Sequence, residues 1–225
     1  MAGLTLVIGN KNYSSWSMRP WVLLRQLGID FEEKKLRFSS AEWDAEIERW
    51  SPSRLVPVLW RGDQPVWDSL AIMEAVNEWH PAKGVWPADP IPRAFARSVA
   101  AVMHSGFRDL RVNMPMNIRA SHPGKGMNAE VKADIGRIEG LWGEARKRFG
   151  AAGPFLFGAF SAADAMYAPV VMRFRTYGVA LGAVAARYCD AMAAAPGVRA
   201  WIDDALREKE IVPEDEPYAS AAPAQ

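Results

Sequence analysis

Residues 53–71 read SRLVPVLWRGDQPVWDSLA, and this segment determines the fold that the chain is expected to adopt. The apolar run Val56–Trp60 predicts a strand, Gly62-Asp63 predicts a tight turn, and Pro65–Trp67 predicts the returning strand. Helical spacing of apolar residues then extends from Ser69 to Trp79. The segment therefore predicts an antiparallel hairpin that runs directly into a helix.

The residues before this hairpin alternate between strand and helix patterns. Leu4–Ile8 predicts a buried strand, and a helix is expected after the loop 11–13, ending at Gly28. Phe31–Phe38 predicts a second strand, and Ser40–Trp50 predicts a second helix. Two strands joined by a helix form a right-handed parallel crossover. The order β-α-β-α-β-β-α therefore predicts an α/β domain, with helices packed on a small mixed sheet.

The composition changes after residue 80. Four prolines lie within residues 81–92, which predicts a linker. Beyond it the strong patterns are helical, and the expected helices are Arg93–Asp109, Ala129–Phe149, Ala162–Thr176, Ala180–Ala194 and Val198–Glu208. Prolines and glycines within 113–128 predict an irregular connection. The expected organisation is an α/β domain over 1–80, the linker 81–92, an all-helical domain over 93–212 and a disordered tail over 213–225.

The composition also excludes several classes of function. The 225 residues carry 27 Lys+Arg against 26 Asp+Glu, and this near-neutral balance gives no support for a nucleic-acid partner. Cys189 is the single cysteine and the three histidines have no ligand spacing, so neither a disulfide framework nor a metal site is expected. No apolar run reaches the ~18 residues of a membrane span. Because the first strand is also too short for a signal peptide, we expect a cytoplasmic protein with no membrane partner.

The segment Tyr13-Ser14-Ser15-Trp16-Ser17 lies between the first strand and the first helix. The N-terminus of a helix gathers unpaired N–H groups and positive potential. A hydroxyl of Ser14 or Ser15 could cap this helix, or it could donate a hydrogen bond to a bound anion. On the residues alone both interpretations stay open.

The pair Val56-Pro57 opens a predicted strand, although proline lacks the N–H that a paired strand needs. A cis bond, as in a tight turn, explains this position. It would turn the N–H and C=O of Val56 outwards, where they can pair with an extended peptide-like ligand. The alternative is an ordinary trans proline at a strand edge.

Asp68-Ser69 opens the predicted helix that ends at Trp79. A helix N-terminus and a serine hydroxyl can hold a carboxylate, and the Asp68 carboxylate can hold an ammonium group. The pair would then bind the zwitterionic end of an amino acid, although it can equally serve as a helix cap. In the helical half, Ser161 and Asp164 have capping-box spacing, and we expect a folding role for them and no catalytic one.

Together these segments resemble the glutathione S-transferase family over nearly the whole chain. The resemblance implies a thioredoxin-like N-terminal domain followed by an all-helical domain. The stretch from Ser14-Ser15-Trp16-Ser17 to Gly28-Ile29-Asp30 is most similar to the zeta class, the isomerases of maleyl-type diacids. Three departures stand out. Trp16 replaces a cysteine of that class, and Asp68 replaces the usual Glu or Gln. Pro20 lies one turn into the first helix, where its missing N–H is tolerated.

The resemblance implies that glutathione is the cofactor, bound by a set of residues carried over one by one: Ser14, Ser15, Arg19, Val56, Pro57, Asp68, Ser69 and Arg108, with Asn113 a weaker candidate. Ser14 is expected to donate to the glutathione sulfur, with Ser15 its close rival. The backbone of Val56 would pair with the cysteinyl part. Asp68 and Ser69 would hold the γ-glutamyl end.

The implied activity is that of a glutathione S-transferase acting on small electrophiles. A free thiol has a pKa near ~8.5, so a hydrogen bond from Ser14 and the positive helix end would favour its thiolate form. Four arginines expected near the cleft, Arg108, Arg111, Arg173 and Arg175, suit an acidic electrophile, so a cis–trans isomerase of a maleyl-type diacid is the alternative.

Two further alternatives differ in class. A non-catalytic binding module on the same fold is disfavoured by the retained serine, Val-Pro and Asp-Ser features. A glutaredoxin-like reductase is disfavoured because it needs a protein thiolate at the start of the first helix. The resemblance also implies a homodimer.

Overall fold

A four-stranded mixed sheet forms the centre of the N-terminal half. The computed structural model describes residues 3–219. The strands lie in the order β2-β1-β3-β4, with bounds β1 Leu4–Ile8, β2 Glu32–Lys35, β3 Val58–Arg61 and β4 Gln64–Val66. Strand β1 pairs parallel with β2 and antiparallel with β3, and β3 pairs antiparallel with β4. The predicted crossover and hairpin are therefore both confirmed.

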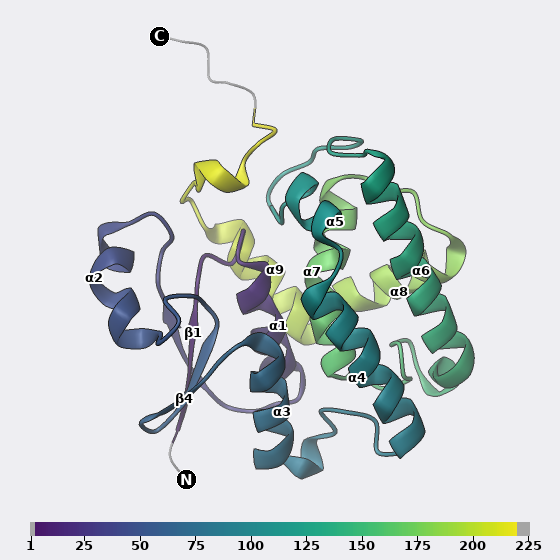
Figure 1. Ribbon diagram of the computed structural model, residues 1–225, viewed down its shortest axis with the longest axis horizontal. Coiled ribbons are helices and arrows are strands. Elements are labelled where there is room, and N and C mark those ends of the chain that lie inside the picture. The colour runs from purple at the N-terminus through teal and green to yellow at the C-terminus, as the bar shows by residue number, and fades with distance from the viewer. Residues whose placement is uncertain (1–2, 220–225) are drawn as a thin grey trace.

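Helices cover both faces of the sheet (Figure 1). Their bounds are α1 Ser15–Gln26, α2 Ala41–Trp50 and α3 Ser69–Trp79, followed by a 3-10 turn, η1 Pro81–Lys83. Because neighbouring side chains of a strand point to opposite faces, Val7 packs in the cluster beneath α2, whereas Leu6 and Ile8 join the large core with α1 and α3.

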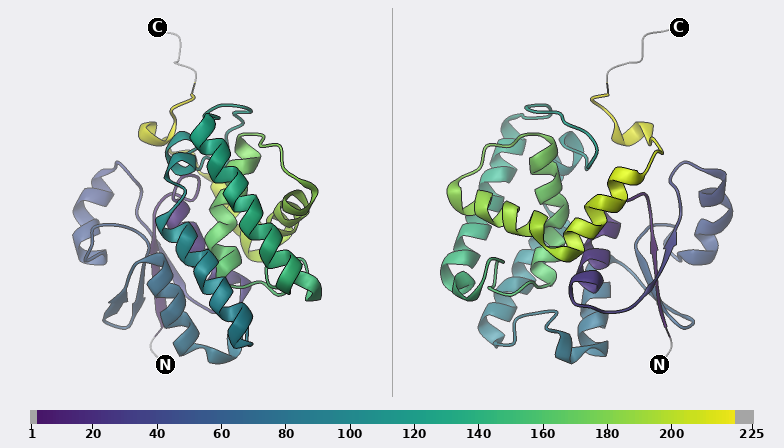
Figure 2. Two further views of the ribbon diagram at one scale, coloured as in Figure 1. Left: turned by 45° about the vertical axis from the view of Figure 1, so that its right-hand side comes forward. Right: turned by 180° about the vertical axis from the view of Figure 1, so that it is seen from behind.

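The C-terminal half is helical. The remaining elements are α4 Pro90–Ser105, α5 Arg108–Asn113, α6 Ala129–Phe149, η2 Gly150–Ala152, α7 Ala162–Thr176, α8 Ala183–Ala194, α9 Pro196–Arg207 and η3 Pro213–Asp215. Helix α7 runs through the centre of this half (Figure 2), and nearly all of its residues are buried. Helix α1 packs against α7 and α9, where Trp21 and Trp201 meet edge to face at 5.2 Å. A continuous apolar core therefore joins the two halves.

The helix expected over Arg93–Asp109 is two helices in the structure. Helix α4 begins at Pro90, earlier than predicted, because the first turn of a helix tolerates proline and the Asp89 side chain caps it. It ends at Ser105, and Gly106 follows where an added Cβ would lie 2.6 Å from the carbonyl oxygen of Val102. The chain turns here, and the second helix, α5, begins at Arg108 and packs against α6.

The tail expected to be disordered is structured over 213–219. Tyr218 donates a hydrogen bond from its hydroxyl to the Asn113 carbonyl at 2.7 Å, and the Tyr13 hydroxyl donates to Glu216 at 2.6 Å. Residues 220–225, the rest of that predicted tail, lie outside the described residues. From its composition, the tail was expected to lose more free energy in chain entropy than its contacts provide. Aromatic packing and these hydrogen bonds offset that loss of entropy. Among the described helices, none is long and apolar enough to span a membrane.

The capping box predicted at Ser161 is present. The Asp164 carboxylate accepts hydrogen bonds from the backbone N–H of Ser161 at 2.9 Å and of Leu156 at 3.0 Å. It also accepts from the hydroxyls of Ser161 and Tyr188. The fully buried carboxylate therefore links the start of α7 to the preceding loop and to α8.

Candidate functional site

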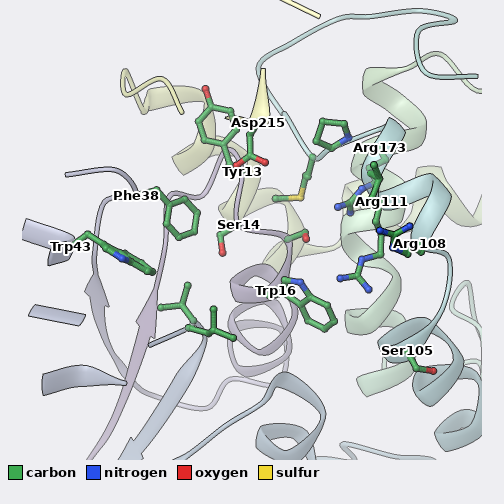
Figure 3. Close-up of a pocket in the computed structure, with 16 residues that line it drawn as sticks. Tyr13, Ser14, Trp16, Phe38, Trp43, Ser105, Arg108, Arg111, Arg173 and Asp215 are labelled. Atoms are coloured by element: carbon green, nitrogen blue, oxygen red, sulfur yellow. The ribbon is translucent and has the colours of Figure 1, made fainter. Parts of the chain in front are cut away.

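Two adjoining cavities lie at the N-terminal half, and the first of them also reaches the helical half. The first, of about 610 Å³, lies among α1, α5 and the end of α7, and Figure 3 shows its lining. The second, of about 570 Å³, lies beside the Val56 segment and the start of α3. Trp16, Leu55 and Val56 line both cavities. The two cavities therefore form one composite cleft, and most of the predicted site residues line it, whereas the fully buried Arg19 and Ser69 do not.

Ser14 and Ser15 are both buried residues that line the larger cavity. Ser14 is the N-cap of α1: its oxygen accepts from the Ser17 N–H, and its hydroxyl donates to the Ser17 oxygen at 2.7 Å. Within the described residues the Ser15 hydroxyl forms no hydrogen bond. The capping role is thus realised at Ser14, while Ser15 keeps a donor available to a ligand.

The Val56–Pro57 peptide bond is cis, as predicted from the sequence. Strand β3 begins two residues later, at Val58, so Val56 lies before the paired strand. Neither the N–H nor the C=O of Val56 has a hydrogen-bond partner in the described part of the chain. Its backbone therefore borders both cavities with unused hydrogen-bonding capacity.

Asp68 and Ser69 begin α3, as predicted. The Asp68 carboxylate caps the helix by accepting from the Ser69 N–H, yet it stays half-exposed and lines the smaller cavity. Its second oxygen lies 3.6 Å from Nε2 of His104. The Ser69 hydroxyl is fully buried and has no partner in the described structure. Asp68 thus caps α3 and still faces the cavity, whereas the Ser69 hydroxyl lines neither cavity.

The cleft is rich in arginine on its helical side. Arg108, Arg111 and Arg173 line the larger cavity, whereas Arg175 lies on an outer groove near Asp190. The expectation that Arg175 faces the cleft is therefore wrong, because it projects from a different face of α7 than Arg173. Burial lowers the pKa of Arg173 to about 10, and the charge of Arg111 adds to this effect. Asn113 does not line the cavity, and its amide donates to the Asp109 carbonyl.

Sequence reasoning missed several lining residues. Phe38 and Trp43 form the wall opposite the arginines, and Asp215 reaches the cavity from η3 (Figure 3). Burial raises the pKa of Asp215, and the charge of Arg173 opposes that effect. The aromatic residue Tyr218 was a signal in the sequence that the tail after residue 212 packs against the rest of the protein, because aromatic residues are depleted in disordered segments.

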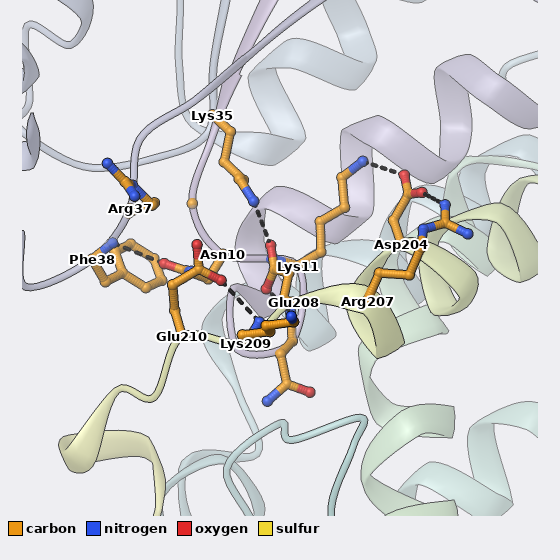
Figure 4. Close-up of polar contacts among 12 residues, drawn as sticks. Asn10, Lys11, Lys35, Arg37, Phe38, Asp204, Arg207, Glu208, Lys209 and Glu210 are labelled. Atoms are coloured by element: carbon orange, nitrogen blue, oxygen red, sulfur yellow. Dashed lines mark hydrogen bonds and ion pairs between the residues drawn. The ribbon is translucent and has the colours of Figure 1, made fainter.

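The loop before α1 is anchored by the end of the chain. Glu208 is buried, and its carboxylate accepts from the backbone N–H of Lys11 at 2.9 Å and of Asn12 at 3.0 Å (Figure 4). Lys35 pairs with the same carboxylate at 3.0 Å. This contact between distant parts of the chain sets where the loop, and so the Ser14 segment, lies.

Glu208→Ala is expected to lower the free energy of unfolding by about 3 kcal/mol, because two buried backbone N–H groups and a lysine lose their acceptor. Urea denaturation followed by tryptophan fluorescence measures this loss. Glu214→Ala is the matched control, since Glu214 is exposed on η3. A loss below about 1 kcal/mol for Glu208→Ala would show that water replaces the acceptor.

Comparison with known proteins now identifies the family. The family model for the glutathione S-transferase N-terminal domain matches residues 13–79, and the model for the C-terminal domain matches residues 126–204. The chain belongs to the glutathione S-transferase family.

Relatives in sequence support the similarity to the zeta class. A Caenorhabditis elegans protein named "Probable maleylacetoacetate isomerase" is 34% identical over 97 residues, which are 43% of this chain and 45% of that protein. The Mus musculus "Maleylacetoacetate isomerase" is 31% identical over 101 residues, 44% of this chain and 47% of that protein. The matched part thus spans a little under half of these curated relatives.

Solved structures share the fold over nearly the whole chain. A glutathione transferase homologue from Burkholderia, solved with bound glutathione, superposes with a TM-score of 0.67 at 24% identity and covers 90% of this chain and 97% of its own. Glutathione transferase Omega 2S from Trametes versicolor gives a TM-score of 0.69 at 19% identity, covering 96% and 99%. The predicted architecture, a thioredoxin-like domain followed by a helical domain, is confirmed.

Proposed function

We propose that this chain is an enzyme that binds glutathione in the composite cleft and activates its thiol for attack on small electrophiles. The observation that carries the proposal is a set of polar groups with unused hydrogen-bonding capacity: the Val56 backbone and the Ser15 hydroxyl line the cleft, and the buried Ser69 hydroxyl follows Asp68, which also lines it. These groups match, in turn, the peptide backbone, the thiol and the γ-glutamyl end of a tripeptide.

The proposed contacts follow the chemistry of the groups. The Val56 N–H and C=O pair with the cysteinyl part as an added strand does. Asp68 accepts from the ammonium group, and Ser69 at the N-terminus of α3 donates to the carboxylate. Arg108 provides a further charged contact from the helical half. The proposed pairing of the Val56 backbone with the ligand depends on Pro57, the residue that follows it. Arg19 lies one helical turn after Ser15 on α1.

Bound glutathione supplies the nucleophilic sulfur. A serine hydroxyl beside it donates a hydrogen bond, and the N-terminus of α1 adds positive potential, so both favour the anionic sulfur. A depression of two pKa units corresponds to about 2.7 kcal/mol and makes the thiolate dominant near neutral pH. The serine keeps its proton, so no histidine partner is required to activate it. The resemblance favours Ser14 as the donor, and the unpartnered hydroxyl favours Ser15.

A second candidate function is the cis–trans isomerisation of a maleyl-type diacid. Arg108, Arg111 and Arg173 line the larger cavity, and arginine binds carboxylates in a fork geometry. The relatives matched in sequence carry the name maleylacetoacetate isomerase. A homodimeric assembly and a cytoplasmic location stay predictions from the sequence.

The proposal is tested by retention on immobilised glutathione, followed by assays with an aryl halide and with a maleyl diacid. Conjugation of the aryl halide supports the transferase, and isomerisation of the diacid supports the second candidate. Retention without either activity would support a binding module instead. Failure to bind glutathione would overturn the proposed function.

Arg108→Gln is expected to raise the KM for glutathione about threefold to tenfold while leaving kcat nearly unchanged, because an exposed charged contact to the tripeptide is lost. Steady-state kinetics at saturating electrophile measures both values. Arg199→Gln is the control, since Arg199 forms an exposed pair with Asp203 outside the cleft. A rise in the KM of the electrophile instead would assign Arg108 to the second substrate.

A further inference from the structure

Trp16 is the second residue of α1 and stands at the junction of the two cavities, lining both. Figure 3 shows it on the same side of the pocket as Arg108 and Arg111, opposite Phe38 and Trp43. The His104 ring packs against it in a T-shaped arrangement, with the ring centroids 5.3 Å apart. Trp16 lies between the helical half and the part of the cleft where the proposed function puts the glutathione sulfur. Its contacts therefore bear on the charge of that sulfur.

The indole ring of Trp16 contacts two guanidinium groups. The Cζ atom of Arg19 lies 3.9 Å from the ring centroid, and that of Arg111 lies 4.4 Å from it. Both distances are well within the range of cation–π attraction. Arg19 comes from α1 and Arg111 from α5, so one aromatic ring holds two like charges from the two halves of the chain.

Arg19 is a buried cation without an anionic partner. Its side chain is 0% exposed, and Nε donates to the Met166 carbonyl. Its Nη1 and Nη2 atoms have no hydrogen-bond partner among residues 3–219. An uncompensated buried charge is strongly unfavourable, and the contact with Trp16 offsets only part of that cost. The folded protein therefore keeps a positive charge that an anion bound nearby would stabilise.

The charges that face Arg19 come from three other helices. Burial lowers the pKa of Arg19, and the charges of Arg173 and Arg111 lower it further, whereas Asp68 and the Tyr167 hydroxyl act in the opposite direction. Asp68 is half-exposed at the start of α3 and caps that helix. The field around the guanidinium is therefore set mainly by like charges, which favours an anion in the cleft.

The position of Arg19 along α1 indicates which anion this is. Ser15 and Arg19 are separated by four residues, so their side chains leave the helix on the same face, one turn apart. Ser15 lines the larger cavity with its hydroxyl unpartnered among the described residues. Arg19 itself lines neither cavity, so its charge lies behind the Trp16 ring, which lines both cavities next to the place where the proposed function puts the glutathione sulfur.

We infer that Arg19 and Arg111, held together on the indole of Trp16, stabilise the negative charge of the glutathione sulfur, and that Trp16 is the positioning residue for this pair. The inference rests on the proposed function. A preorganised charge in a site shielded from water stabilises a developing anion more strongly than the same charge in solvent. The ring allows the two arginines to approach each other at that place.

The test compares the pKa of bound glutathione in Arg19→Met, Trp16→Leu and Trp16→Phe with that of the parent, using the ultraviolet absorbance of the thiolate against pH. We expect Arg19→Met and Trp16→Leu to raise this pKa by about one, and Trp16→Phe to raise it less because phenylalanine keeps an aromatic face. Trp79→Leu is the control, since Trp79 lies under Arg61 at 4.8 Å and does not line either cavity.

Thermal unfolding separates this role from a structural one. Arg19→Met removes an unpaired buried charge, so its melting temperature should equal or exceed that of the parent even as the thiolate pKa rises. A lower melting temperature with an unchanged thiolate pKa would overturn the inference and make Arg19 a structural residue. An unchanged thiolate pKa together with weaker binding of an acidic electrophile would also overturn it, assigning the arginines to the second substrate. If the parent binds no glutathione, the proposed function fails and the inference fails with it.

Discussion

Replacing both Ser14 and Ser15 by alanine is expected to lower the rate of glutathione conjugation about fiftyfold at about pH 6.5. The reason is that loss of the hydroxyl donor raises the pKa of the bound thiol by about two, so the reactive thiolate becomes scarce. Affinity for glutathione should change little, because Val56, Asp68 and Ser69 are proposed to hold the tripeptide. The measurements are the thiolate absorbance against pH and the steady-state kinetics.

The single variants Ser14→Ala and Ser15→Ala show how much each hydroxyl contributes to the rise in the thiol pKa. Ser14→Ala should also cost about 1 kcal/mol of stability, since Ser14 caps α1, whereas Ser15→Ala should leave stability unchanged. The single variant that accounts for most of the pKa rise identifies the donor. Ser98→Ala, which removes a hydroxyl from the outer surface of α4, is the control. An unchanged thiolate pKa in the double variant would refute the serine mechanism.

Asp164→Ala is expected to lower the free energy of unfolding by about 4 kcal/mol. The carboxylate is fully buried and is the acceptor for the N–H groups of Leu156 and Ser161 and for the Tyr188 hydroxyl. Each buried donor left without a partner costs about 1–3 kcal/mol. Chemical denaturation measures the loss. Asp203→Ala, which breaks an exposed ion pair with Arg199, should cost less than about 1 kcal/mol.

Asp164 is also expected to make the free energy of unfolding depend on pH. Burial raises the pKa of Asp164 to about 6 in the folded chain, above its usual value of 3.8. The folded chain therefore binds a proton between these two values that the unfolded chain does not, and this group adds stability as the pH falls through 6. The difference between the parent and Asp164→Ala should then be larger at about pH 5 than at about pH 8. A smaller difference at the lower pH would contradict this assignment.

Local patterns were sufficient for most of the secondary structure. The bounds of α3, α6 and α7 agree with the predicted ranges, because their caps and apolar spacing lie within the segments themselves. The capping box of α7 and the cis bond before Pro57 also follow from neighbouring residues. The predicted helix bounds were wrong at the start of α4 and at Gly106, because the effect of a proline or a glycine there depends on the residues around it in the folded chain.

Short motifs around Ser14, Val56 and Asp68 were enough to predict the family and the segments that line the candidate site, because each motif lies within a few neighbouring residues. Which distant residues complete the cleft follows from the packing of the folded chain. Asp215 enters the cavity from a tail whose composition predicts disorder, and Glu208 anchors the loop before α1 across almost the whole chain. The contact of Trp16 with Arg111 likewise depends on how the two halves pack, whereas its contact with Arg19 lies within α1. Charges and rings far apart in the sequence carry no local signal of their pairing, because burial and distance arise only when the core closes.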